Sequence, residues 1–102
     1  MSVVVVATIV PEPAHRDEVI AAVERAIARV HLEEGCDLYA LNEAPDRLVM
    51  VEKWRDQGAL DRHGRGEALQ ELNAALDGRL AKPTEVVVLA PHPAGTPEQG
   101  AV

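Results

Sequence analysis

Four side chains in the middle of the chain have the chemistry of a small-molecule site. They are Tyr39, Glu52, Trp54 and His63, and the chain has no other Tyr or Trp and no Phe. An imidazole is an acid or base suited to neutral pH, and a Tyr hydroxyl beside a carboxylate can orient a polar ligand. If the fold brings these side chains together, they form a site that could hold a small molecule and take a proton from it.

A tight turn is expected to bring three of them together. The segment 33–54 reads EEGCDLYALNEAPDRLVMVEKW, and its APDR sequence predicts a hairpin between strands near 37–43 and 47–54. With Pro45 and Asp46 as central residues, the predicted pairs are Glu43 with Leu48, Leu41 with Met50, Tyr39 with Glu52, and Asp37 with Trp54. Side chains alternate between faces, so all these residues share one face of the sheet. Leu41 and Met50 would form an apolar floor there.

His63 is predicted to approach the same face from a helix. It lies three positions after Leu60, so both share a helix face that should point inward. The helix pauses directly afterwards, at Gly64. An imidazole at this point could reach into the gap between helix and sheet and act on a bound molecule.

Plainer interpretations of these residues stay open. Trp54 at the end of a strand could fill the core, and Tyr39 with Glu52 could be an ordinary cross-strand pair. His63 could serve only as a helix cap that interacts with the helix dipole. Cys36 is expected to be a small buried hydrophobe, and the other histidines are expected to be solvated.

The predicted elements follow the order β-α-β-β-α-β. Residues 2–10, SVVVVATIV, form an apolar strand, and a helix with acids in its first turn follows. Gly35 is expected to end this helix through a positive-φ cap. A second helix begins in RDQGALDRH, is interrupted by GRG at 64–66 and resumes in EALQELNAAL, and TEVVVLA is the last strand. This order predicts an α+β, ferredoxin-like split βαβ fold, with both helices on one face of an antiparallel sheet.

Length, charge and composition bound the classes of protein. The 102 residues make one domain at 1–90, followed by a Pro/Gly-rich tail at 91–102 that is expected to be flexible. A net charge of −7 with no Lys/Arg cluster argues against binding to nucleic acid or to an anionic membrane. One Cys excludes an internal disulfide, and the apolar N-terminal run is too short to span a bilayer. We therefore expect a cytoplasmic protein.

No motif for a cofactor or metal appears in the sequence. It has no CxxC, HxH or HExxH pattern, and its GRG follows a helix rather than a strand, unlike a phosphate-binding loop. A Ser nucleophile motif is also missing. Any chemistry is therefore expected to run without a metal and without a cofactor.

The last strand predicts that the partner is a second copy of the chain. In this topology the last strand lies at a sheet edge, and its residues 86–89, VVVL, are apolar on both faces. An apolar edge strand invites pairing with another chain. We therefore expect a homodimer whose sheets pack face to face.

The hairpin and the following helix resemble the antibiotic biosynthesis monooxygenase domain. That family shows E-G-C-x-x-Y, a hairpin, a strand ending in E-x-W, and then A-L-x-x-H. The matching residues are Glu34, Gly35, Cys36, Tyr39, Glu52, Trp54, Ala59, Leu60 and His63. The element order is similar over residues 2–90, and the specific motif covers 34–63.

The resemblance implies a dimeric α+β barrel with a pocket between the helices and the sheet of each subunit. Characterised members oxidise phenolic or hydroquinone-type substrates with O₂ and without flavin or metal, and others bind and degrade haem. By this resemblance His63 would accept the substrate proton and Trp54 would position the ring. Tyr39 and Glu52 would hydrogen-bond substrate oxygens, beside Met50 and Leu41.

Two differences from the family bear on the substrate. Haem-degrading members use an Asn of the first strand, which this chain lacks, and the segment after His63, GRGEALQEL, has no aromatic residue. Both differences favour a small substrate over haem. The alternatives to an enzyme are a non-catalytic dimer that binds a metabolite or haem, and a stress-response barrel without catalysis.

Overall fold

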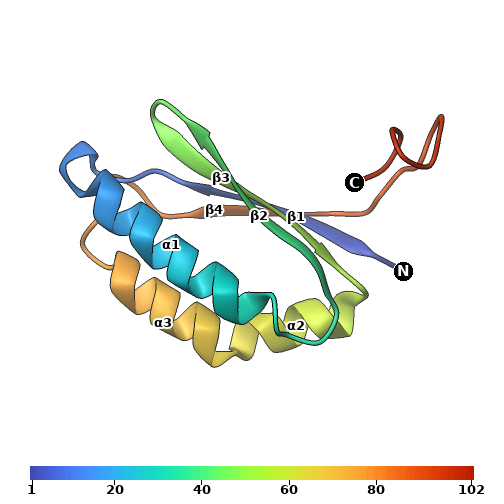
Figure 1. The fold of residues 1–102 in the computed structure, drawn as a ribbon, viewed down its shortest axis with the longest axis horizontal. Helices are drawn as coiled ribbons and strands as arrows, with labels where there is room; N and C mark the ends of the chain where they lie inside the picture. The colour runs from blue at the N-terminus through green and yellow to red at the C-terminus, as the bar shows by residue number, and fades with distance from the viewer.

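The protein folds into a sheet of four strands with all of its helices on one face (Figure 1). The computed structural model describes residues 1–102. Its elements are β1 (Val3–Ile9), the 3₁₀ helix η1 (Pro13–His15), α1 (Arg16–Val30), β2 (Cys36–Ala44), β3 (Arg47–Trp54), α2 (Gln57–Arg65), α3 (Glu67–Leu76) and β4 (Glu85–Leu89). The ferredoxin-like α+β prediction is confirmed, with the second helix divided into α2 and α3 at Gly66.

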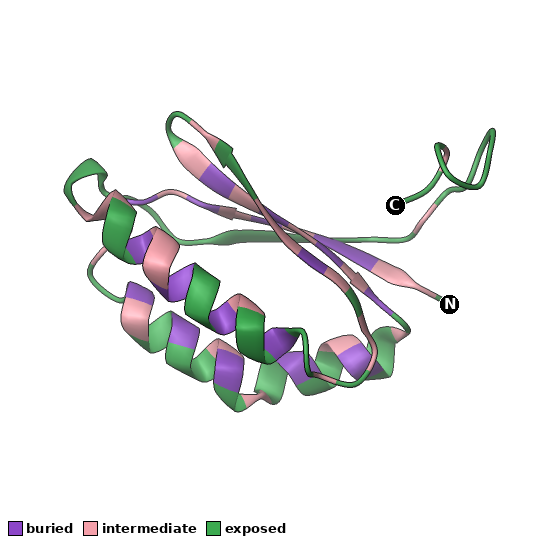
Figure 2. Cartoon of the chain, viewed as in Figure 1, coloured by how far each residue is buried: buried purple, intermediate pink, exposed green.

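The antiparallel sheet has the strand order β2-β3-β1-β4. The β-branched strand β1 lies inside the sheet between β3 and β4, and β4 lies at an edge, as predicted. Every residue of β4 is exposed, and Figure 2 shows the strand in green along its whole length.

The hairpin register is confirmed except at its open end. Tyr39 pairs with Glu52, and the turn is centred on Pro45 and Asp46. The predicted pairing of Asp37 with Trp54 is wrong, because a bulge between Cys36 and Leu38 places Cys36 opposite Trp54. A bulge adds one unpaired residue to its strand, which a simple alternation cannot reveal.

Gly35 does not cap α1 as expected. The helix ends at Val30, and a turn of five residues leads from there to β2. Gly35 does have a positive φ, 84°, but its place is in this turn. A Cβ on Gly35 would lie 2.5 Å from the Cβ of Ala59, so the turn packs tightly on α2.

The core lies between the helices and the inner face of the sheet. Apolar residues at helical spacing give α1 a buried stripe, with Val19, Val23 and Val30 fully buried. They pack with alternate residues of β1 and β3, such as Val5 and Leu48. In Figure 2 the buried residues gather on the sides of the helices that face the sheet.

The chain after the sheet forms no helix or strand. β4 ends at Leu89, and residues 90–102 extend beyond the sheet near the N-terminus (Figure 1). No helix in the structure has the length and apolar character that a membrane span requires.

Candidate active site

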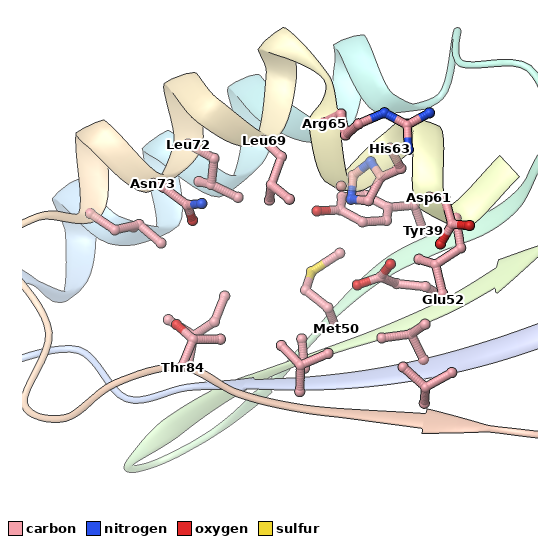
Figure 3. Close-up of a pocket in the computed structure, with 18 of the residues that line it drawn as sticks. Tyr39, Met50, Glu52, Asp61, His63, Arg65, Leu69, Leu72, Asn73 and Thr84 are labelled. Atoms are coloured by element: carbon pink, nitrogen blue, oxygen red, sulfur yellow. The ribbon is translucent and has the colours of Figure 1, made fainter. Parts of the chain in front are cut away.

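A cavity of about 530 Å³ separates the inner face of the sheet from α2 and α3 (Figure 3). Its walls are mainly apolar side chains of β1, β3, β4 and α3, among them Val5, Met50, Leu69 and Leu72. The mouth lies along the edge strand, where the lining residues Val86 and Val88 are 58 % and 53 % exposed. Small-molecule sites are typically concave and apolar, with a few polar groups that fix orientation.

Three polar side chains converge at one end of this cavity. Tyr39 comes from β2, Glu52 from β3 and His63 from α2, and Figure 3 shows them pointing toward one another beside Met50. The ring centroids of Tyr39 and His63 lie 5.5 Å apart, and Glu52 and His63 are each only 5 % exposed. The predicted cluster of these side chains is therefore present, because strand alternation and helix phase place all three on the inward side.

The hydrogen bonds of this cluster leave one polar atom of each side chain free. His63 donates Nδ1–H to Oε1 of Glu33 at 2.9 Å, and Trp54 donates Nε1–H to Oε1 of Glu52 at 3.0 Å. The Tyr39 hydroxyl, Nε2 of His63 and Oε2 of Glu52 have no partner in the protein, yet none of these atoms is sealed from the solvent-accessible space. These three atoms are available to a molecule in the cavity.

Two of these groups have pKa values that burial shifts in the same direction. It raises the pKa of Tyr39 far above its ordinary value, and the nearby carboxylate of Glu52 adds to that effect. Burial also raises the pKa of Glu52, against the opposing hydrogen bond from Trp54 and the opposing charge of His63. Tyr39 is therefore a hydroxyl that can donate a hydrogen bond, because removing its proton would place a negative charge beside the Glu52 carboxyl in a poorly hydrated site.

Trp54 contacts Glu52 and His63 on the side away from the cavity and does not line the cavity itself. Its side chain is fully buried, and its rings stack on His63 with a centroid distance of 4.5 Å and an interplanar angle of 30°. The expected contact of Trp54 with a substrate ring is corrected accordingly, since the indole fills the core and orients Glu52 and His63. Of the two predicted floor residues, Met50 lines the cavity, whereas Leu41 is half-buried against the core outside it.

Sequence reasoning missed the second polar end of the cavity and the partner of His63. Asn73 of α3 and Thr84, just before β4, lie at the end opposite His63 (Figure 3). Asn73 shares a helix face with Leu69 and Leu76, so helical phase could have indicated it. Glu33 had no such signal, because its hydrogen bond to His63 joins residues far apart in the chain. The structure brings no group of three His, Cys, Asp or Glu side chains together in a way that could hold a metal ion.

The fold and the cavity define an α+β domain with an internal small-molecule site. The sequence profile of the antibiotic biosynthesis monooxygenase family matches residues 2–75, well over half of the chain. The chain therefore belongs to the antibiotic biosynthesis monooxygenase family, which confirms the resemblance drawn from its hairpin.

Individual relatives agree with this assignment. The Mycobacterium tuberculosis protein named "Putative monooxygenase Rv0793" is 34 % identical over 91 residues, which cover 87 % of this chain and 90 % of that protein. Its solved structure superposes with a TM-score of 0.87 at 31 % identity, covering 94 % of this chain and 100 % of that chain. A conserved protein of Methanosarcina mazei Go1 superposes with a TM-score of 0.83 at 30 % identity, covering 87 % and 91 %. These similarities confirm the fold and support a general monooxygenase-type function.

Proposed function

We propose that this protein is a cofactor-independent monooxygenase that oxidises a small phenol or hydroquinone with O₂. The observation that carries the proposal is the convergence of the Tyr39 hydroxyl, Nε2 of His63 and Oε2 of Glu52 at one end of an apolar cavity. An apolar wall suits an aromatic ring, and three hydrogen-bonding atoms at its end suit a ring hydroxyl. Membership of the family and the Rv0793 relative support the reaction class.

The proposed reaction starts with a proton transfer. Nε2 of His63 takes the proton of the substrate hydroxyl, while the Tyr39 hydroxyl donates a hydrogen bond to the oxygen that becomes negative. The electron-rich phenolate then gives one electron to O₂, and recombination of the two radicals forms a peroxide on the ring carbon beside the oxygen. The His63 imidazolium returns its proton to the outer peroxide oxygen. The hydrogen on the ring carbon then leaves as a proton while the O–O bond breaks, so that the carbon becomes a carbonyl and the departing hydroxide takes up this proton to form water. For hydroquinone the sum is one hydroquinone and one O₂ giving one hydroxyquinone and one water.

A homodimer and a reducing compartment belong to the same proposal. The uncovered sheet face and the exposed apolar strand β4 support a second copy of the chain as the partner. The single free Cys36 is compatible with the reducing cytoplasm.

An isotope experiment tests the reaction. The protein, treated with chelator and supplied with no flavin, is mixed anaerobically with 1,4-hydroquinone, and ¹⁸O₂ is then admitted. We expect one ¹⁸O atom in the hydroxyquinone and one in water, measured by mass spectrometry, together with equal consumption of O₂ and hydroquinone. His63→Ala should slow this turnover roughly a hundredfold or more, because a general base contributes about that factor. The matched control is His92→Ala, which removes an exposed imidazole from the tail.

Three results would count against the proposal. Binding of hydroquinone without O₂ uptake would identify a non-catalytic binding protein. A Soret band on adding haemin would identify haem, rather than a phenol, as the ligand of the cavity. Turnover by His63→Ala as fast as by the unaltered protein would show that His63 is not the base.

A further inference from the structure

We propose that Glu33 is the positioning residue of His63. Its carboxylate holds the Nδ1–H of the imidazole, so that the unprotonated Nε2 faces the cavity and the positive charge that forms on the ring is balanced. The inference rests on the proposed function only in taking His63 as the base. Glu33 would contact neither the substrate nor O₂ and would act through His63 alone.

Of the groups that contact His63, only Glu33 determines its tautomer. The ring centroid of His63 lies 4.5 Å from that of Trp54 and 5.5 Å from that of Tyr39, so these two rings fix the plane of the imidazole from two sides. An imidazole held in this way can still carry its proton on either nitrogen. Nδ1 lies 2.9 Å from Oε1 of Glu33, and a carboxylate can only accept a hydrogen bond, so the proton of a neutral ring must be on Nδ1.

Glu33 is also the charge best placed to balance an imidazolium. Of the other two acids at this end of the cavity, Glu52 of β3 has a pKa raised by burial, so it is less ready to carry a negative charge. Asp61 of α2 is exposed and accepts a hydrogen bond from Gln57 at 3.0 Å. From β2 the ring meets the neutral Tyr39 hydroxyl, and the thiol of Cys36 near Glu33 has a pKa raised by burial. The Glu33 side chain is 25 % exposed, so it is hydrated at its outer side while it bonds His63 at its inner side.

The turn between α1 and β2 is built to hold Glu33 in this place. The backbone N–H of Glu33 donates to the carbonyl of Val30 at 2.9 Å, and Nε2–H of His31 donates to the carbonyl of Tyr39 at 3.0 Å. On the other side, the backbone N–H of Arg55 donates to the carbonyl of Gly35 at 2.8 Å. These bonds tie the turn to both strands of the hairpin, and the turn in its place brings the Glu33 carboxylate within hydrogen-bond distance of His63.

Glu33 neither gains nor loses a proton in the proposed reaction. When the substrate O–H bond breaks, the new N–H bond forms at Nε2 of His63, and the Nδ1–H bond stays intact. The same proton leaves Nε2 for the outer peroxide oxygen. The carboxylate thus stabilises the imidazolium between these two steps, as the acid of a Ser-His-Asp triad does for its histidine.

Nitrogen NMR of the ligand-free protein tests the tautomer without any turnover. With His63 deprotonated at alkaline pH, long-range ¹H–¹⁵N spectra should show Nδ1 protonated and Nε2 unprotonated. Glu33→Ala should shift His63 to the Nε2–H tautomer that a free imidazole prefers in water. The matched control is Glu34→Gln, whose neighbouring carboxylate is 77 % exposed and faces Arg55 instead. An Nε2–H tautomer in the unaltered protein, or no change in Glu33→Ala, would overturn the inference.

Kinetics with 1,4-hydroquinone then test the charge. Glu33→Gln keeps the size and one acceptor oxygen but removes the charge, so we expect kcat to fall roughly tenfold to a hundredfold while KM changes less than about twofold. Glu34→Gln should keep the original kcat. An unaltered kcat in Glu33→Gln would refute the charge-balancing role. A protein that turns over no hydroquinone at all would refute the proposed function, whereas the NMR result would still decide whether Glu33 sets the tautomer.

Discussion

Glu52 is a carboxyl group that the fold removes almost completely from water. Its side chain is 5 % exposed, and only the indole N–H of Trp54 donates to it, at 3.0 Å. One hydrogen bond offsets only part of the hydration that an ionised carboxylate loses on burial. The result is a pKa above the ordinary value of 4.5, with burial as its largest cause.

The raised pKa of Glu52 predicts how stability depends on pH. The folded state holds the proton of the Glu52 carboxyl more tightly than the unfolded state does. The contribution of this proton to the free energy of unfolding is therefore complete below the unfolded pKa and is lost as the pH rises through the folded pKa. Glu52→Gln keeps the acceptor for Trp54 and cannot ionise. Its free energy of unfolding should therefore rise relative to that of the unaltered protein as the pH increases from about 4 to 8.

Urea denaturation at a series of pH values measures this difference. The matched control is Glu24→Gln on the exposed side of α1, which should leave the pH dependence as it is. A difference between Glu52→Gln and the unaltered protein that stays constant with pH would show that burial does not shift this carboxyl.

The residues of the site differ in how far the sequence could predict them. Tyr39 and Glu52 follow from alternation around a turn, and His63 follows from helix phase, since these are local rules. Trp54 was expected to contact a substrate. Residues on one face of a sheet can point either into the core or into the cavity, and which of these holds for Trp54 depends on how α2 packs on the sheet. Glu33 depends on a turn whose path no periodic pattern describes.

The turn between α1 and β2 is the element that links the helix layer to the site. It carries Glu33 toward His63 and reverses the chain at Gly35, where φ is 84°. A residue with a side chain is strained at such a φ, and here its Cβ would also meet the Cβ of Ala59 at 2.5 Å. The sequence EEGC thus combines the carboxylate of Glu33 with Gly35, the residue whose positive φ and missing Cβ let the turn pack against α2 and bring Glu33 to His63.

Gly35→Ala should destabilise the protein by more than its φ alone explains. The matched control is Gly78→Ala, because Gly78 has a similar φ of 77° and no atom within 4 Å of a Cβ. We expect Gly78→Ala to cost about 1 kcal/mol and Gly35→Ala about 2–4 kcal/mol in free energy of unfolding, measured by urea denaturation. Equal losses in the two variants would show that the contact with Ala59 relaxes freely.

The strand and helix boundaries show what sequence patterns can define. The break between α2 and α3 falls at Gly66, inside the predicted interruption, where the backbone is extended with φ −78° and ψ 161°. The end of α1 was placed too late, since the turn after Val30 satisfies its own backbone through hydrogen bonds from Leu32 and Glu33. Such local bonding follows from conformation rather than from residue type.

At the scale of the whole molecule, the sheet has one face covered by helices and one uncovered. Alternation places Val6, Val49, Val51 and Val87 on the uncovered face, opposite the residues that line the cavity. An antiparallel sheet that faces water on one side usually carries polar residues there. A contiguous apolar face of this kind marks an interaction surface, and the sheet of a second copy offers a surface of the same kind.

Val51→Glu should separate the proposed homodimer into monomers. Val51 pairs with both Val6 and Ala40, so it lies inside the uncovered face, and a carboxylate there would be buried against the partner's sheet without a counter-charge. In the monomer the same side chain would face water, so the fold itself should remain. Light scattering at micromolar concentration should give twice the chain mass of 11.0 kDa for the unaltered protein and a single chain mass for Val51→Glu. Ala74→Glu, which adds the same charge on the exposed side of α3, should leave the dimer intact. A monomeric mass for the unaltered protein would refute the dimer and leave this apolar face without its proposed partner.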